Sequence, residues 1–198
     1  MTEYAATIAI GYLLTRFATG RDVRQSGSGN IGATNVLRTA GRKLGIATLV
    51  LDIAKGTVPA LIGKYAFDND GAAAAGACAA VVGHVWPVFA GFRGGRGVAT
   101  TFGGILGLAP LLAICFPIIG GVLILTTRYV SVMSVVGVPV CALLVVAAAA
   151  LGWSEWEYVA YAVFATALVE YKHVPNIKRL LAGTEPKIGR GGDQPATG

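Results

Sequence analysis

Charged residues are scarce in this sequence. Aspartate, glutamate, lysine and arginine make up 13% of the 198 residues, against about 25% in a soluble domain. Hydrophobic residues account for 55% and form long runs, which excludes a soluble protein and indicates a polytopic membrane protein. A transmembrane barrel is also excluded, because runs such as VVGVPVCALLVVAAAALGW do not alternate in polarity. We therefore expect an all-α integral membrane protein, whose spanning segments satisfy their own backbone hydrogen bonds.

Cysteines and acidic clusters are also rare. The three cysteines, Cys78, Cys115 and Cys141, lie in apolar stretches without metal-like spacing, which predicts packing roles and neither a disulfide nor a zinc site. The sequence has no cluster of aspartates suited to a metal ion, so we expect no metal and no cofactor. The formal net charge of +6 does not indicate nucleic-acid binding, because a membrane-embedded chain leaves no folded basic face for it.

The charges between the apolar stretches predict the topology. The apolar stretches cover residues 4–19, 45–67, 72–90, 98–127, 130–152 and 156–171. Several connecting segments are basic, around residues 21–43, 93–96, 128 and 172–187, whereas the segments around residues 68–70 and 155–157 are short and acidic. The positive-inside rule puts the basic segments in the cytoplasm and the acidic segments outside.

The stretch 98–127 decides the number of membrane crossings. Arg96 and Arg128 flank it, and they share one side only if the stretch crosses an even number of times. About 30 residues are too few for two full spans of about 20 residues each, so we predict two short helices with a tight turn at Pro110. The resulting prediction is seven transmembrane helices, with the N-terminus outside and the C-terminus in the cytoplasm. They form one domain over residues 1–198, in which 185–198 is a polar cytoplasmic tail.

The segment GSGNIGATNVLR, residues 27–38, contains the spacing G-x-G-x-x-G. A dinucleotide site needs a preceding strand, whereas a membrane helix precedes this segment, and a Walker A loop needs Lys-Ser or Lys-Thr after the glycines. Glycines also let backbone N–H groups turn toward one anion, so the segment predicts an anion-binding loop at the membrane surface. Its polar residues are Ser28, Asn30, Thr34, Asn35 and Arg38.

Three further cytoplasmic segments have similar chemistry. In GHVWPVFAGFRGGRGVATT, Gly94, Gly95 and Gly97 flank Arg96 before an expected helix, a pattern suited to phosphate. His84 lies upstream, where an imidazole could bind substrate, relay a proton or serve only in packing. The segments TTRYVSVMS and HVPNIKRLLAGTEPK supply Arg128 and Ser131, and His173, Asn176 and Arg179.

Two charged residues lie within an apolar helix. Asp52 and Lys55 are three residues apart, so they share one face of the helix. A charged pair at this depth is a candidate functional site, and we interpret it first as mutual neutralisation that orients the helix.

With these segments identified, the sequence resembles the bacterial acyl-phosphate:glycerol-3-phosphate acyltransferases, the PlsY family of integral membrane enzymes. The resemblance covers essentially the whole chain and rests on SGNIGATNVLR, GHVWPVFAGFRGGRGVAT, RYVSVMS and HVPNIKRLLAGTE. It implies transfer of a fatty acyl group from acyl phosphate to the sn-1 hydroxyl of glycerol 3-phosphate, giving lysophosphatidic acid. It also implies seven helices in the bacterial inner membrane, an active site facing the cytoplasm, and a soluble enzyme that supplies acyl phosphate as a partner.

The family pattern also implies residue roles. The residues expected to be catalytic are Ser28, Arg38, Arg96, His173 and Asn176. Those expected to bind substrate are Asn30, Thr34, Asn35, His84, Gly95, Arg128, Ser131 and Arg179. The family usually has lysine where this chain has Arg96, which keeps the charge but contacts phosphate differently.

Acyl phosphate is already activated, so the hypothesis needs no acyl-enzyme. In it, Ser28, Asn35 and Arg38 hold one phosphate, Arg96 and Arg128 hold the other, and His173 and Asn176 orient the glycerol, while the acyl chain lies between helices. Neither histidine begins an H-x-x-x-x-D motif, which favours proton removal by substrate phosphate. The alternative classes are a transporter or anion channel, a CDP-alcohol phosphotransferase and a purely structural membrane protein.

Overall fold

The computed structural model describes residues 10–188, and every regular element within them is a helix. The longer elements are α2 (Ile10–Thr19), α3 (Ala33–Ala40), α4 (Arg42–Leu61), α5 (Asp70–Val85), α6 (Val98–Leu108), α7 (Pro110–Ala113), α8 (Cys115–Thr127), α9 (Val130–Ala150) and α10 (Trp156–Leu181). Three shorter turns of helix are η1 (Val23–Gln25), η2 (Ile62–Ala66) and η3 (Val88–Ala90). The all-α prediction is confirmed for this part of the chain.

Within residues 10–188, three helical segments are long and apolar enough to cross a membrane by themselves. They are Arg42–Ala66, Pro110–Thr127 and Val130–Ala150. The helices Asp70–Val85 and Val98–Leu108 are apolar but shorter. The first predicted apolar stretch begins at residue 4, so part of it lies outside the described residues, as does most of the tail predicted for 185–198.

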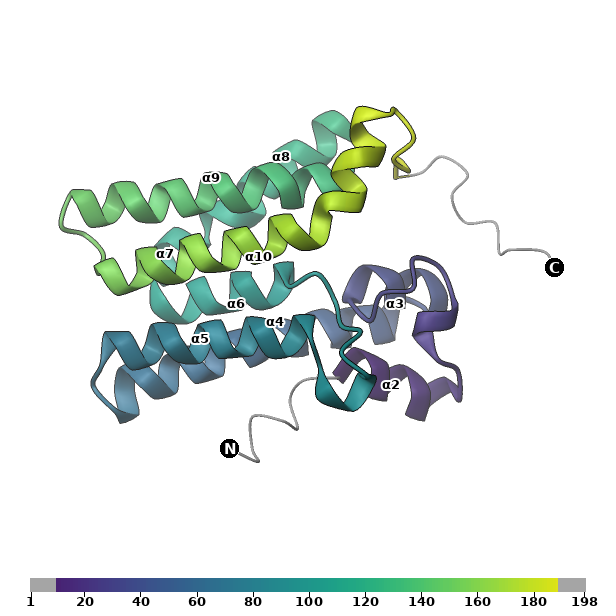
Figure 1. Cartoon of the computed structure of the whole chain (residues 1–198), viewed down its shortest axis with the longest axis horizontal. Coiled ribbons are helices and arrows are strands. Elements are labelled where there is room, and N and C mark those ends of the chain that lie inside the picture. The colour runs from purple at the N-terminus through teal and green to yellow at the C-terminus, as the bar shows by residue number, and fades with distance from the viewer. Residues whose placement is uncertain (1–9, 189–198) are drawn as a thin grey trace.

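Pro110 breaks the apolar stretch 98–127, as predicted. Ala109, with φ −140° and ψ 75°, leaves the helical conformation, because the residue before a proline is disfavoured in the α region. Pro110 then occupies the first turn of α7, where its missing N–H has no helical partner to lose. The break therefore lies at Ala109, after which α7 and α8 together form the segment Pro110–Thr127. The helices α6 and α8 run in opposite directions on either side of the break (Figure 1).

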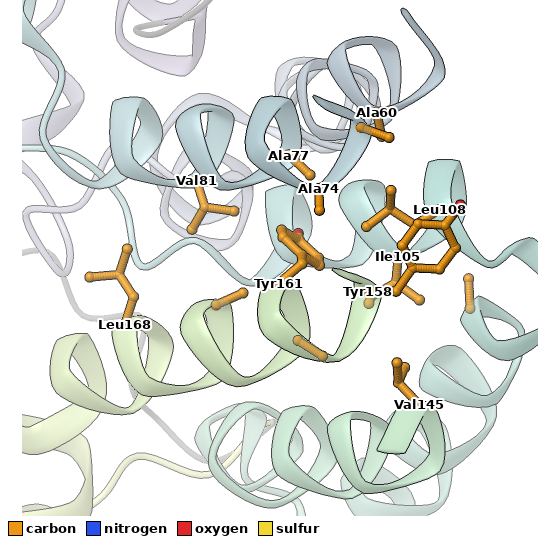
Figure 2. Close-up of a cluster of buried hydrophobic side chains, with 14 of the residues drawn as sticks. Ala60, Ala74, Ala77, Val81, Ile105, Leu108, Val145, Tyr158, Tyr161 and Leu168 are labelled. Carbon is orange, nitrogen blue, oxygen red and sulfur yellow. The ribbon is translucent and has the colours of Figure 1, made fainter. Parts of the chain in front are cut away.

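The helices pack in layers, with α4 and α5 on one side, α6 and α10 between, and α8 and α9 on the other (Figure 1). Small residues allow the closest approaches. Gly103 on α6 lies so near α4 that a Cβ there would be 2.9 Å from the carbonyl carbon of Ile53. The apolar core joins these layers, and Figure 2 shows Val81, Ile105 and Tyr161 pointing into it from α5, α6 and α10.

The predicted basic segments lie at one end of the helix bundle. The chain between α2 and α4, the segment between α5 and α6, the α8–α9 junction and the end of α10 all gather there (Figure 1). The acidic turns between α4 and α5 and between α9 and α10 lie at the opposite end (Figure 1). The candidate site is therefore built from chain segments that are far apart in sequence.

Candidate active site

Asn35 organises the first glycine loop. It is buried at the start of α3, and its Nδ2 donates to the carbonyl oxygens of Val23, Ser26 and Asn30 at 3.0, 3.1 and 2.7 Å. Its Oδ1 accepts from the backbone N–H of Ser28 at 2.9 Å. The amide is thus used within the protein, so Asn35 shapes the loop. The Ser28 side chain is exposed, and its hydroxyl oxygen accepts a hydrogen bond from Asn30 Nδ2 at 3.3 Å.

Glycine is required at position 27 of this loop. Gly27 has a φ of +61°, and a Cβ there would overlap the side chain of Asn35. A positive φ is strained for residues with a side chain, so both backbone conformation and space select glycine. Asn30, Thr34 and Arg38 lie at the open side of the loop, half-buried in the first case and exposed in the other two.

Arg24 joins the first loop to the second. Its guanidinium forms an ion pair with Asp22 at 2.7 Å and donates to the carbonyl oxygen of Ala90 at 2.9 Å. The side-chain hydrogen bond from Arg24 is the main reason why the pKa of Asp22 lies below its usual value. Sequence reasoning used Arg24 only for topology, whereas the structure gives it the role of connecting the two glycine-rich segments.

The second glycine loop packs directly against His84. The backbone N–H of Gly95 donates to the His84 carbonyl oxygen at 3.1 Å. A Cβ on Gly95 would lie 2.7 Å from Cε1 of the His84 ring and closer still to Nε2. Gly97, with a φ of +88°, precedes α6. The backbone next to Arg96 can therefore approach the edge of the imidazole ring only because residue 95 is glycine.

The intramembrane pair predicted from the sequence is confirmed, with a third member. Lys55 Nζ lies 2.5 Å from Asp52 Oδ1 and 2.6 Å from Nδ1 of His84. All three side chains are buried, with exposed fractions of 2%, 5% and 3% for Asp52, Lys55 and His84. The sequence showed the pair on α4, but His84 comes from α5 and joins only through helix packing.

The carboxylate of Glu185 lies among the polar side chains of Asn176, Arg179 and Ser131. Asn176 Nδ2 donates to its Oε1 and Arg179 Nε to its Oε2, both at 2.7 Å. The Ser131 hydroxyl lies near this carboxylate without a hydrogen bond of normal geometry. Burial alone would raise the pKa of Glu185, but Asn176, Ser131 and Arg179 outweigh it and hold the pKa below the ordinary 4.5.

Sequence reasoning missed Glu185 as a site residue and assigned it to the tail. The only signal available was that it is the one acidic residue in the basic segment from Lys172 to Lys187. Its side chain is 6% exposed, and residues 185–188 contact the rest of the chain, since Ile188 N–H donates to the Arg128 carbonyl oxygen at 2.9 Å.

Arg96 lies where the two glycine loops and the end of α10 meet. It is half-buried. Burial lowers the pKa of Arg96, the charges of Arg179 and Arg38 lower it further, and Glu185 raises it. Three of the predicted arginines are therefore close enough to influence one another, which leaves an excess of positive charge suited to an anion.

His173 and Arg128 differ in their position relative to this cluster. His173 is buried on α10, and its Nδ1 lies 2.8 Å from the Val169 carbonyl oxygen. Since a carbonyl only accepts, Nδ1 carries the proton and Nε2 is an acceptor. Arg128 is exposed, with a φ of +64°, and its guanidinium donates to the Ile188 carbonyl oxygen at 3.0 Å. It thus contacts the C-terminal segment.

An apolar crevice lies between α6, α8, α9 and α10. Its free volume is about 20 Å³, so side chains nearly fill it in this structure. Phe102 and Phe116 stack in its wall with ring centroids 5.6 Å apart. Thr101, one turn into α6 from Gly97, also lines it, so the crevice begins close to the Arg96 loop.

Known proteins match this chain over most of its length. A family model described as Glycerol-3-phosphate acyltransferase matches residues 4–183. A glycerol-3-phosphate acyltransferase of Thermoanaerobacter pseudethanolicus is 44% identical over 179 residues, covering 90% of this chain and 88% of the relative. The Brucella canis enzyme of that name is 47% identical over 186 residues, covering 94% and 89%.

Solved structures match as well. The crystal structure of PlsY (YgiH), an integral membrane glycerol 3-phosphate acyltransferase, in its glycerol 3-phosphate form has a TM-score of 0.86 at 36% identity and covers 93% of this chain and 90% of that one. Its lysophosphatidic acid form has a TM-score of 0.79 at 34% identity, covering 94% and 96%.

The fold, the basic end of the bundle and these similarities define an integral membrane acyltransferase of phospholipid biosynthesis. The resemblance seen in the sequence is confirmed. The chain belongs to the glycerol-3-phosphate acyltransferase family, of the PlsY type.

Proposed function

We propose that this protein transfers a fatty acyl group from acyl phosphate to the sn-1 hydroxyl of glycerol 3-phosphate, producing lysophosphatidic acid and phosphate. The observation that carries the proposal is the gathering of Arg38, Arg96 and Arg179 at one end of the bundle, beside His173 and Asn176. Two phosphate-bearing reactants repel each other, and fixed cations and N–H groups offset that repulsion.

The first glycine loop and Arg38 hold one phosphate. Asn35 keeps the loop in shape, and the Ser28 and Arg38 side chains are both exposed to a ligand. The second loop holds the other phosphate through Arg96, whose forked guanidinium can bind two oxygens. Arg128 reaches this site only if its hydrogen bond to the Ile188 carbonyl oxygen is exchanged for substrate.

His173 and Asn176 orient the glycerol. Nε2 of His173 can accept a hydrogen bond from the attacking hydroxyl, because Nδ1 already donates to Val169. Oδ1 of Asn176 is buried and has no hydrogen-bond partner in the described residues, which suits a second substrate hydroxyl. Glu185 holds the Asn176 amide in this orientation through its Nδ2.

The chemical step needs no covalent intermediate. The sn-1 oxygen forms a bond with the acyl carbonyl carbon, the bond from that carbon to the bridging phosphate oxygen breaks, and the hydroxyl proton passes to a phosphate oxygen. Cations stabilise the oxyanion that forms and the phosphate that leaves. The acyl chain lies in the crevice beside Phe102 and Phe116.

We further propose that the chain is a single domain of seven transmembrane helices in the bacterial inner membrane, with an outside N-terminus and a site that faces the cytoplasm. Acyl phosphate would then arrive from a soluble enzyme on that side. The arrangement of basic segments at one end and acidic turns at the other supports this orientation (Figure 1).

The test of the reaction is an assay of purified protein with labelled glycerol 3-phosphate and three donors in parallel: acyl phosphate, acyl-CoA and acyl carrier protein. We expect labelled lysophosphatidic acid, esterified at sn-1, with acyl phosphate. Product formed only with a thioester would refute the proposed donor. For topology, single cysteines at positions 93 and 128 should be protected from an impermeant reagent in intact cells, whereas a cysteine at position 68 should react.

A further inference from the structure

The buried group Asp52, Lys55 and His84 has a use beyond the orientation of α4. It joins α4 to α5 directly behind the second glycine loop, since Lys55 contacts both Asp52 and His84 at 2.5 and 2.6 Å. His84 Nδ1 lies 3.5 Å from Asp52 Oδ1. Burying ionised groups is costly unless they are paired and hydrogen-bonded. We therefore expect the protons of these three residues to occupy the positions that leave each buried charge paired.

The hydrogen-bond donors and acceptors determine where the protons lie. A lysine ammonium has three donors and no acceptor. With Lys55 protonated in its ion pair with Asp52, the His84 Nδ1 at 2.6 Å is placed to accept from the ammonium. The imidazole is then neutral and carries its proton on Nε2. Asp52 and Lys55 cancel each other, and the group as a whole has no net charge.

The Nε2–H of His84 points to the glycine loop. It lies against Gly95, where a Cβ would overlap the ring. No hydrogen bond to Nε2 is found among the described residues, and Nε2 is not one of the side-chain atoms that are fully buried without a partner. The N–H therefore keeps the access that a ligand needs to supply an acceptor. The neighbouring Arg96 indicates that the ligand is an anion.

We propose that Asp52 and Lys55 are positioning residues that fix His84 as a neutral imidazole protonated on Nε2, and that this N–H binds a phosphate oxygen of the substrate held by the second glycine loop. The proposal rests on the proposed function for the identity of that substrate. It also removes His84 as a general base, because Nε2 already holds a proton in the resting enzyme.

The proton position is measurable without any assay of activity. The chain has only two histidines, so nitrogen-15 NMR of histidine-labelled protein in lipid nanodiscs gives four ring signals, which His173→Asn assigns. For His84 we expect an unprotonated Nδ1 and a protonated Nε2 whose signal shifts when glycerol 3-phosphate or non-hydrolysable acyl phosphate is added. A protonated Nδ1, an imidazolium, or an Nε2 signal unaffected by both ligands overturns the proposal even if the assay demonstrates acyl transfer from acyl phosphate.

Kinetics of Lys55→Met test the positioning role. Without the ammonium, Nδ1 can donate to Asp52, which leaves the Nε2 lone pair facing phosphate. The loss of a hydrogen bond to a charged group predicts a fall in kcat/KM of roughly 10- to 100-fold, mainly through KM. The substrate whose KM rises, glycerol 3-phosphate or acyl phosphate, identifies the phosphate that His84 binds.

The double variant Asp52→Asn/Lys55→Met separates proton placement from general packing. The carboxamide introduced at position 52 can donate to Nδ1 and so restore the Nε2–H form. We expect the double variant to recover most of the activity lost in Lys55→Met, with an NMR signal of the wild-type form. A double variant that folds, shows the Nε2–H signal and is still as slow as Lys55→Met contradicts the proposal.

Replacement of the ring itself provides a second comparison. His84→Gln retains an N–H donor near the Nε2 position but cannot act as a base at neutral pH, whereas His84→Phe retains only bulk. We expect the glutamine variant to be at least tenfold more active than the phenylalanine variant. Equal activities in folded proteins would refute the donor role.

Discussion

The contact between Gly95 and His84 allows a sharp prediction for Gly95→Ala. Gly95 does not have a positive φ, so alanine fits its backbone conformation and the effect is purely steric. The new Cβ would lie 2.7 Å from His84 Cε1, whereas carbon atoms prefer about 3.5–4.0 Å. The loop therefore has to move by about 1 Å, because the ring is held on its other side by Lys55.

Such a shift acts on catalysis more than on folding. Overpacking costs about 1–3 kcal/mol, which a local loop displacement partly relieves. A misplacement of about 1 Å at a positioning element costs on the order of 100-fold in rate, so we expect kcat/KM to fall by about that factor. The assay is initial-rate kinetics with labelled glycerol 3-phosphate, alongside thermal unfolding in detergent.

Two further variants complete this experiment. Gly121→Ala is the matched control, because a Cβ there meets no atom within 4 Å, and its activity should equal that of the wild type. In Gly95→Ala/His84→Ala the steric overlap is gone, so stability should recover while activity stays low for lack of the imidazole. Near-native kinetics of a folded Gly95→Ala protein would show that the loop geometry does not control the reaction.

Four other outcomes are expected. Gly103→Ala places a Cβ 2.9 Å from the Ile53 carbonyl carbon and should destabilise the α4–α6 packing by about 1–3 kcal/mol, seen as a lower thermal midpoint; an unchanged midpoint would contradict the close approach. Glu185→Gln should lose about 1–2 kcal/mol at neutral pH. Because the folded-state pKa of Glu185 lies below 4.5, its stabilisation is present above that ordinary value and is lost as the pH falls through the folded-state value, so the variant should show a flatter acid-side stability curve in pH-dependent thermal melts. Arg38→Ala should lower kcat/KM for glycerol 3-phosphate by roughly 10- to 100-fold without a change in melting, and full activity would exclude it from the phosphate site. Ala142→Phe fills the crevice and should shift donor preference to shorter acyl phosphates, by about fourfold in kcat/KM for each methylene that no longer fits; an unaltered chain-length profile would place the acyl chain elsewhere.

Local chemistry made several features predictable. The break at Pro110 follows from its ring and its missing N–H, and the Asp52–Lys55 pair from a spacing of three residues on a helix. Each depends on residues close together in the chain, so pattern and spacing were enough. That the glycine- and arginine-containing loops bind an anion stays a prediction.

Other contacts depend on distant segments. Asn35 was predicted to bind substrate, which stays a prediction, and the structure adds that its amide donates to loop carbonyl groups up to 12 residues away. Glu185 was assigned to a tail, yet it accepts hydrogen bonds from Asn176 and Arg179. No local pattern could indicate these partners. Which donors and acceptors bond to Asn35 and Glu185 depends on how the loops fold over the ends of the helices.

The sequence by itself determined an all-helical membrane protein and its family, because apolar length, small residues and short motifs carry that information locally. Only the tertiary structure decided that His84 joins the Asp52–Lys55 pair and that Gly95 packs against the edge of its ring. The physical reason is that a proton's position in a buried group depends on which donors and acceptors the packing of α4, α5 and the second glycine loop brings within hydrogen-bond distance.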